Sequence, residues 1–223
     1  MRRALSPNFG ARRNGARPDH VVIHYTAMKT AEAAIRWLCA PASQVSAHYV
    51  ICKTGAITQL VPEGARAWHA GLGSWHSETD MNSRSVGIEL DNMGTGPFSE
   101  PQMRALLWLL GAVTARWAIP AQNVIGHSDL APGRKIDPGP HFDWSRLADA
   151  GLAAPVRLRP FHKDASPDRF TQLARQAGYT AEVSFEALLE SVRLRHRPGA
   201  QGALSQEDMA ALAGVAELSG ARA

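Results

Sequence analysis

The chain has 223 residues, 45% of them hydrophobic and 20% charged, which suits one medium globular domain followed by a small one. The formal net charge of +4 is mild and the arginines are scattered, so the sequence gives no indication of a nucleic acid partner. The opening residues, MRRALSPNFGARRNGARPDH, include no apolar stretch, which argues against a secretory signal and membrane insertion and predicts a cytoplasmic protein.

The first predicted strand ends at a histidine. Residues 21–23 are an apolar run typical of a buried strand, and His24 follows at its exit. Side chains at strand ends are frequently functional, which makes His24 a candidate metal ligand; the alternative is a core histidine hydrogen-bonded to backbone. Helical spacing of apolar residues over 30–39, with Thr30 as N-cap, predicts a helix next.

A hairpin and a further strand follow. Residues 46–53 and 56–61 predict two strands joined at Thr54-Gly55. Residues 86–90 predict another strand, which carries Glu89 among apolar neighbours. A carboxyl group that is partly removed from water has a raised pKa and suits general acid–base chemistry near neutral pH. The alternative is a glutamate on an edge strand that points to water.

The longest predicted helix covers residues 99–117. Ser99 and Gln102 have the spacing of a capping box. One apolar stripe is expected from Met103, Leu106, Leu107, Leu110 and Val113. A short strand at 123–126 then leads to His127. This alternation of strands and helices predicts an α/β fold, with a mixed central β-sheet flanked by helices and the functional residues where strand ends and loops converge.

The stretch GHSDLAPGRKIDPG at 126–139 concentrates the chemistry. His127 and Asp137 are separated by a loop whose prolines and glycines prevent a continuous helix, so an imidazole and a carboxylate can reach one metal ion. Lys135 lies two residues before the carboxylate and, in an extended segment, on the same face. Hydrolytic zinc sites need three nitrogen or oxygen ligands, an open position, and a group that offsets developing charge.

Five segments occur in order along the chain: VVIHYTA (21–27), SAHYVICKTGAITQLV (46–61), RAWHAG (66–71), NSRSVGIELDN (82–92) and GHSDLAPGRKIDPGPHFDW (126–144). Together they closely resemble the type-2 N-acetylmuramoyl-L-alanine amidases, zinc enzymes related to phage amidases and to peptidoglycan recognition proteins. The resemblance covers roughly residues 6–152.

The resemblance implies a site by position. His24, His127 and Asp137 would be ligands of Zn²⁺, Glu89 the general base, and Lys135 the group that stabilises the oxyanion. Non-catalytic relatives typically lack part of the metal triad, whereas here all these positions are filled, which favours an enzyme.

The reaction that this family implies is hydrolysis of the amide between N-acetylmuramic acid, or its 1,6-anhydro form, and L-alanine of a peptidoglycan stem peptide. Muropeptides would be its partners. The lack of an export signal favours a role in muropeptide recycling. The alternatives are a lytic amidase that acts on intact wall and a non-catalytic muropeptide sensor.

A substrate groove is expected from Trp68, His69, Asn82 and Arg134. Aromatic faces stack on sugar rings, and arginine pairs with peptide carboxylates. A functional and a structural role are equally indicated for Trp75, His76 and His48.

The last third of the chain has a different pattern. Residues 1–152 would form the catalytic domain, 153–165 a linker rich in proline and basic residues, and 166–223 a module of three short helices. This module loosely resembles the three-helix peptidoglycan-binding modules of some relatives; a packing appendage or a dimer contact are the alternatives. Because every candidate catalytic residue precedes Leu152, we expect the module to aid binding and not catalysis.

The two cysteines, Cys39 and Cys52, do not form a CxxC pair, so they resemble neither a zinc clip nor a redox motif. Both have apolar neighbours, which favours buried free thiols. A disulfide between them is the alternative.

Overall fold

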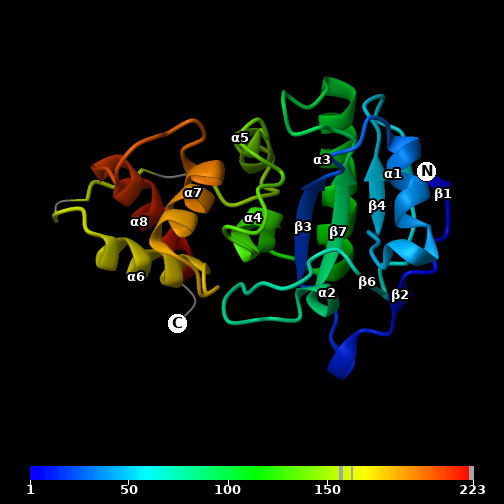
Figure 1. The fold of residues 1–223 in the computed structure, drawn as a ribbon, viewed down its shortest axis with the longest axis horizontal. Helices are drawn as coiled ribbons and strands as arrows, with labels where there is room; N and C mark the ends of the chain where they lie inside the picture. Colours follow the sequence, from blue (N-terminus) through cyan, green and yellow to red (C-terminus); the bar gives the residue numbers. More distant parts are fainter. Residues whose placement is uncertain (156–157, 162, 221–223) are drawn as a thin grey trace.

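A mixed six-stranded sheet forms the centre of the molecule in the computed structural model, which describes residues 1–155, 158–161 and 163–220 (Figure 1). From edge to edge the strands are β1 (Arg2–Arg3), β5 (Ile57–Gln59), β4 (Tyr49–Ile51), β7 (Ser85–Leu90), β3 (His20–Tyr25) and β8 (Val124–Gly126). In this sheet β4 and β5 pair antiparallel, as the predicted hairpin requires, and the other neighbouring pairs are parallel. Two short strands, β2 (Phe9–Gly10) and β6 (Arg66–Ala67), form a separate antiparallel pair.

Alternation along the strands divides the sheet between two faces. Val21 and Ile23 of β3 pack on α3 (Glu100–Trp117), whereas Val22 packs on the opposite face. On that opposite face α1 (Ala31–Leu38) covers Val50, and its N-cap is Thr30 as predicted. The same alternation turns His24 of β3 and Glu89 of β7 away from α3.

Short helical segments fill the connections. They are α2 (Met81–Arg84), α4 (His127–Leu130), α5 (Trp144–Asp149) and the 3-10 turns η1 (Arg13–Gly15), η2 (Pro41–Ser43) and η3 (Ala121–Asn123). Among the helices of the described residues, none is long and apolar enough to cross a membrane.

The long helix departs from its prediction in two details. Leu109 is buried in place of Leu107, which is only partly buried, because α3 presents a wider face to the sheet than one stripe. Ser99 accepts the Gln102 backbone N–H at 3.4 Å, but the Gln102 amide donates to Ile51 O at 2.8 Å. The reciprocal half of the capping box is therefore replaced by a bond that satisfies a carbonyl at the end of β4.

Three helices follow the sheet, as predicted: α6 (Pro167–Ala177), α7 (Phe185–His196) and α8 (Gln206–Gly220). In Figure 1 they lie beside α4, at the opposite end of the molecule from the N-terminus. Ser166 caps α6, and Ser205 and Asp208 exchange hydrogen bonds at the start of α8. Residues 156–157, 162 and 221–223 of the predicted linker and module lie outside the described residues.

The C-terminal helices share an apolar core with the sheet. This core contains Val22, Ile125 and Leu130 from the first part of the chain. From α6–α8 it contains Phe170, Ala174, Leu188, Leu189, Val192, Met209 and Leu212. The helices therefore cover a sheet face that would otherwise expose apolar side chains to water.

The two cysteines are free thiols, and both are half-buried rather than fully buried. Cys39 Sγ lies 3.5 Å from Ala4 O, and Cys52 Sγ lies 2.9 Å from Thr54 Oγ1. Burial raises the pKa of the Cys39 thiol. Each thiol thus packs against its own neighbour, and no disulfide joins the two cysteines.

Candidate active site

Three buried side chains bring donor atoms together where β3 and β8 end. His24 comes from β3, His127 follows β8 as the first residue of α4, and Asp137 lies in the loop after α4. Parallel pairing of the two strands sets Ile23 opposite Gly126 and places both histidines at one end of the sheet. The two Nδ1 atoms are 3.0 Å apart and lie 2.8 and 3.1 Å from Asp137 Oδ2.

The contacts of the two Nε2 atoms indicate which nitrogen of each histidine carries the proton. His127 Nε2 lies 2.9 Å from Ala70 O, so it carries the proton and donates, which leaves a lone pair on Nδ1. His24 Nε2 lies 3.1 Å from His69 Nδ1 and donates there in the same way. Two lone pairs and a carboxylate oxygen then point at one another, an arrangement that a cation balances.

The charge states suit metal binding. Burial and the neighbouring His127 lower the pKa of His24 to about 4, so its imidazole is neutral at neutral pH. Neutral imidazoles and an ionised carboxylate are the forms that ligate divalent metals.

The donor set fits zinc. All three ligand atoms lie within 4.8 Å of one another, and each residue is buried. Two imidazole nitrogens and one carboxylate oxygen are a ligand set of hydrolytic zinc sites, which leave one position open. The same three residues line a cleft, so a metal ion held by them would be reached from it.

His69 continues the hydrogen bonding away from the ligands. Its Nε2 lies 3.3 Å from Ser85 Oγ, and that hydroxyl donates to Met81 O. Burial, with the neighbouring His24 and His48, lowers the pKa of His69 well below its usual value. His69 therefore accepts from His24 and fixes the direction in which the His24 ring presents Nδ1.

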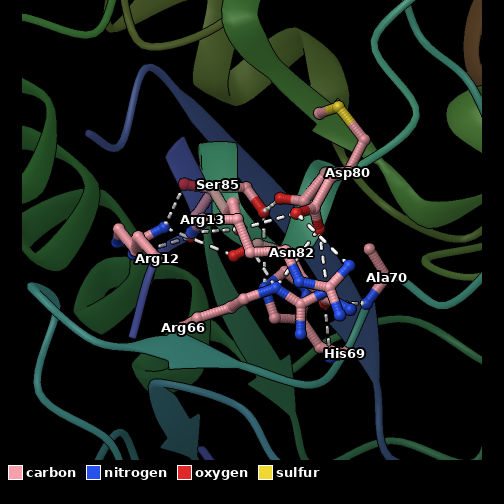
Figure 2. Close-up of polar contacts among 10 residues, drawn as sticks. Arg12, Arg13, Arg66, His69, Ala70, Asp80, Asn82 and Ser85 are labelled. Atoms are coloured by element: carbon pink, nitrogen blue, oxygen red, sulfur yellow. Dashed lines mark hydrogen bonds and ion pairs between the residues drawn. The ribbon is translucent and has the colours of Figure 1, made fainter. Parts of the chain in front are cut away.

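The loop that carries His69 is held by a buried polar network. Figure 2 shows Asn82 beside His69 and Ala70, with Arg12, Arg13 and Arg66 around it. Asn82 Oδ1 accepts the backbone N–H groups of His69 and Ala70, at 2.9 and 2.8 Å. The Arg12 guanidinium donates to the carbonyls of Asn82, Ser83, Ser85 and Glu63. This network fixes the loop before any ligand arrives.

A glycine in β7 makes room for this arrangement. A Cβ atom at Gly87 would lie 2.5–2.6 Å from the His69 ring, closer than real Cβ contacts allow. The imidazole therefore rests on bare backbone, and a side chain at this position would push it out of line with His24.

The cleft that the donor residues line has a volume of about 520 Å³, within the range of small-molecule binding sites. Its lining combines apolar side chains with the cations Lys135 and Arg134. The remaining lining includes Tyr25, Thr26, Met28, Trp37, Leu38, Val45, Trp68, His69, Glu89 and Ile136.

Glu89 lies beside the donor residue His24, because β3 and β7 pair His24 with Glu89 in register. Burial, with the nearby Asp137 charge, raises the pKa of Glu89 to about 8, and Lys135 opposes the rise. Its buried Oε2 has no hydrogen-bond partner among the described residues. A carboxyl in this state exchanges protons readily near neutral pH.

The predicted groove residues are divided by the structure. Trp68, His69 and Arg134 line the cleft, whereas Asn82 is buried behind it and binds backbone. The Arg134 guanidinium donates to Ala70 O at 2.8 Å and also to Leu72 O, so it braces the loop from the cleft side.

The residues with an undecided role lie outside the cleft. His48 Nδ1 accepts the Gly87 N–H at 2.9 Å, and Trp75 packs edge-to-face on Tyr179 in the core shared with the C-terminal helices. His76 follows Trp75 in the chain and is not part of the cleft wall. The sequence interpretation missed Trp37, whose signal was a tryptophan on the exposed side of α1, where it is 51% exposed.

We expect His69→Ala to weaken zinc binding by about 10–100-fold, the usual effect of losing a partner that orients a metal-bound histidine. His69→Gln keeps an acceptor and should restore part of this loss. The measurement is competition with a chromophoric chelator. His141→Ala, which removes an exposed histidine outside the cleft, is the control. Wild-type zinc affinity in His69→Ala would rule out the orienting role.

Comparison with known proteins identifies the family to which the chain belongs. The family model described as N-acetylmuramoyl-L-alanine amidase matches residues 14–140. The chain is 40% identical over 150 residues to N-acetylmuramoyl-L-alanine amidase AmiD of Escherichia coli, covering 60% of this chain and 53% of that protein. It is 34% identical over 163 residues to 1,6-anhydro-N-acetylmuramyl-L-alanine amidase AmpD of Citrobacter freundii, covering 66% and 87%.

Solved structures extend the similarity into the C-terminal helices. AmpDH3 of Pseudomonas aeruginosa superposes with a TM-score of 0.79 at 30% identity, over 92% of this chain and 94% of that one. E. coli AmiD, solved with anhydro-N-acetylmuramic acid-L-Ala-D-gamma-Glu-L-Lys, gives 0.75 at 28% identity, over 96% and 89%. The family resemblance of the sequence is confirmed: the chain belongs to the N-acetylmuramoyl-L-alanine amidase family of hydrolases.

Proposed function

We propose that the chain binds Zn²⁺ through His24, His127 and Asp137 and hydrolyses the amide between N-acetylmuramic acid and L-alanine of a stem peptide. The observation that carries this proposal is the convergence of three donor atoms, 2.8–3.1 Å apart, on residues that line a cleft. A buried carboxyl with a raised pKa stands beside them.

When bound, Zn²⁺ supplies Lewis acidity toward the scissile carbonyl and the attacking water. Glu89 takes the proton from that water and passes it to the departing amine of L-alanine. Lys135 also lines the cleft, and its ammonium would offset negative charge on the carbonyl oxygen. His69 and the Asn82 network keep His24 in one orientation throughout.

The cleft also suits the two ends of the substrate. Trp68 and Trp37 offer aromatic faces for sugar rings, and Arg134 offers a cation for peptide carboxylates. Because Arg134 already holds two loop carbonyls, a bound carboxylate would be coupled to the loop that orients His24.

We further propose that the preferred substrate is a 1,6-anhydro-muropeptide, as in cell-wall recycling. The structures of E. coli AmiD and P. aeruginosa AmpDH3 contain anhydromuramic acid peptides, and both superpose on most of this chain. AmpD proteins, named for the 1,6-anhydro substrate, support the same reading.

Hydrolysis of defined substrates tests this function. We expect the zinc-loaded protein to release peptide with a free L-alanine amine from an anhydro-muropeptide much faster than from whole sacculi, as measured by mass spectrometry. Faster release from sacculi would identify a lytic amidase. Binding without release from either substrate would identify a sensor and contradict the enzymatic proposal.

A further inference from the structure

We propose that Arg195 and Tyr179 of the C-terminal region are positioning residues for the turn that carries His127 (126–129), here called the metal-binding turn. The C-terminal helices would then be part of the catalytic unit. The inference rests on the proposed metal site. Its basis is the set of contacts made by Asp129, the second residue after His127.

Asp129 connects the turn to the C-terminal helices. Its side chain is fully buried. Oδ2 accepts the Gly126 N–H at 2.7 Å and an Arg195 N–H at 2.6 Å, and Oδ1 accepts the Tyr179 hydroxyl at 2.8 Å. Asp129 thus closes the turn that presents His127 while both of its oxygens are held from the C-terminal region.

Helix α7 contacts the turn on both sides of His127. Arg195 also donates to Val124 O at 3.1 Å, before the ligand, and Ser191 Oγ donates to Ser128 O at 2.6 Å, after it. The Arg195 guanidinium stacks over the Trp144 ring at 4.1 Å, which fixes its plane. The backbone that flanks His127 is therefore bound to one rigid helix.

The turn transmits its position to the other loop ligand. The Ser128 N–H donates to Asp137 O at 2.9 Å, so a shift of this backbone would move His127 and Asp137 together. In addition, a Cβ at Gly133 would lie 3.0 Å from Ala187 Cβ, which shows that α7 also approaches the loop leading to Lys135.

The same helix supplies a matched control. Arg193 is 9% exposed and Arg195 is 6% exposed, and each lies 2.6 Å from a buried carboxylate. Arg193 pairs with Asp208 of α8, within the C-terminal helices, whereas Arg195 pairs with Asp129 of the metal-binding turn. Each substitution removes one cation from a buried carboxylate that keeps other partners: Asp208 keeps Arg197 at 2.6 Å, and Asp129 keeps the Tyr179 hydroxyl at 2.8 Å. We therefore expect both variants to lose stability.

The test compares Arg195→Met, Tyr179→Phe and Arg193→Met in the full chain. Zinc dissociation constants are measured by chelator competition and thermal stability by circular dichroism. We expect both arginine variants to lose thermal stability. Only Arg195→Met and Tyr179→Phe should also weaken zinc binding, by about tenfold or more, as for other groups that orient metal ligands. Arg195→Lys should recover part of the affinity.

Each outcome is informative. Equal zinc affinity in all three variants and the wild type, or equal weakening in Arg193→Met and Arg195→Met, would overturn the inference. If Arg195→Met does not fold, Tyr179→Phe, which removes a single hydroxyl group, decides the question alone. A wild-type protein without stoichiometric zinc would instead refute the proposed metal site.

Discussion

Replacing His24, His127 or Asp137 with alanine is expected to remove stoichiometric zinc and to abolish amidase activity. Each residue supplies one of three donor atoms that lie 2.8–3.1 Å apart, and two donors hold zinc too weakly for stable occupancy. Chelation of the wild-type protein should likewise end activity, and added Zn²⁺ should restore it.

Metal analysis of the purified variants checks this expectation, with circular dichroism to show that each is folded. His141→Ala is the control, because this exposed histidine lies outside the cleft and its loss should change neither zinc content nor turnover. Full zinc occupancy in all three ligand variants would show that the ion binds elsewhere.

The three donor residues of the proposed metal site could be picked out from the sequence because their signals are local. His24 ends a short apolar strand, and the loop between His127 and Asp137 is marked by prolines and glycines. Parallel pairing of β3 with β7 and β8 then brings these strand ends together. Residues that lie at the ends of neighbouring strands can therefore be predicted from the sequence pattern.

The supporting network could not be predicted in the same way. Asn82 has the residue type of a substrate-binding side chain. In the structure it accepts the backbone N–H groups of His69 and Ala70, which lie 13 and 12 positions earlier in the chain. Arg12 lies 51 to 73 positions from the carbonyls it binds. Gly87 carries a sequence signal for this network, since a glycine inside a strand indicates close approach of another group, here the His69 ring.

The C-terminal region shows the same limit. Caps and amphipathic spacing predicted α6, α7 and α8, because these features are local. The pairing of Arg195 with Asp129 spans 66 positions, and each residue on its own has the pattern of a solvated charge. That these helices aid binding alone stays a prediction, and the contacts of Asp129 are the reason we propose a larger role.

Glu89→Gln should lose about 10²–10⁴ in kcat while keeping zinc, the usual contribution of a positioned general base. The amide has nearly the same shape as the carboxyl, so the β3–β7 register and the metal ligands should be undisturbed. In the wild-type enzyme, kcat should rise with pH as the Glu89 carboxyl loses its proton, since only the ionised form accepts one from water. The variant should lack this rise.

Lys135→Ala should show a similar loss of kcat with zinc retained, because it removes the charge that offsets the carbonyl oxygen. Lys53→Ala, at an exposed position on the β4–β5 hairpin, is the matched control for loss of a lysine. Single-turnover kinetics on an anhydro-muropeptide, with zinc content measured in the same samples, separates the chemical step from binding. Near-wild-type turnover in Glu89→Gln would remove Glu89 from the reaction. If Glu89→Gln lost zinc together with turnover, Glu89 would be assigned to metal binding instead.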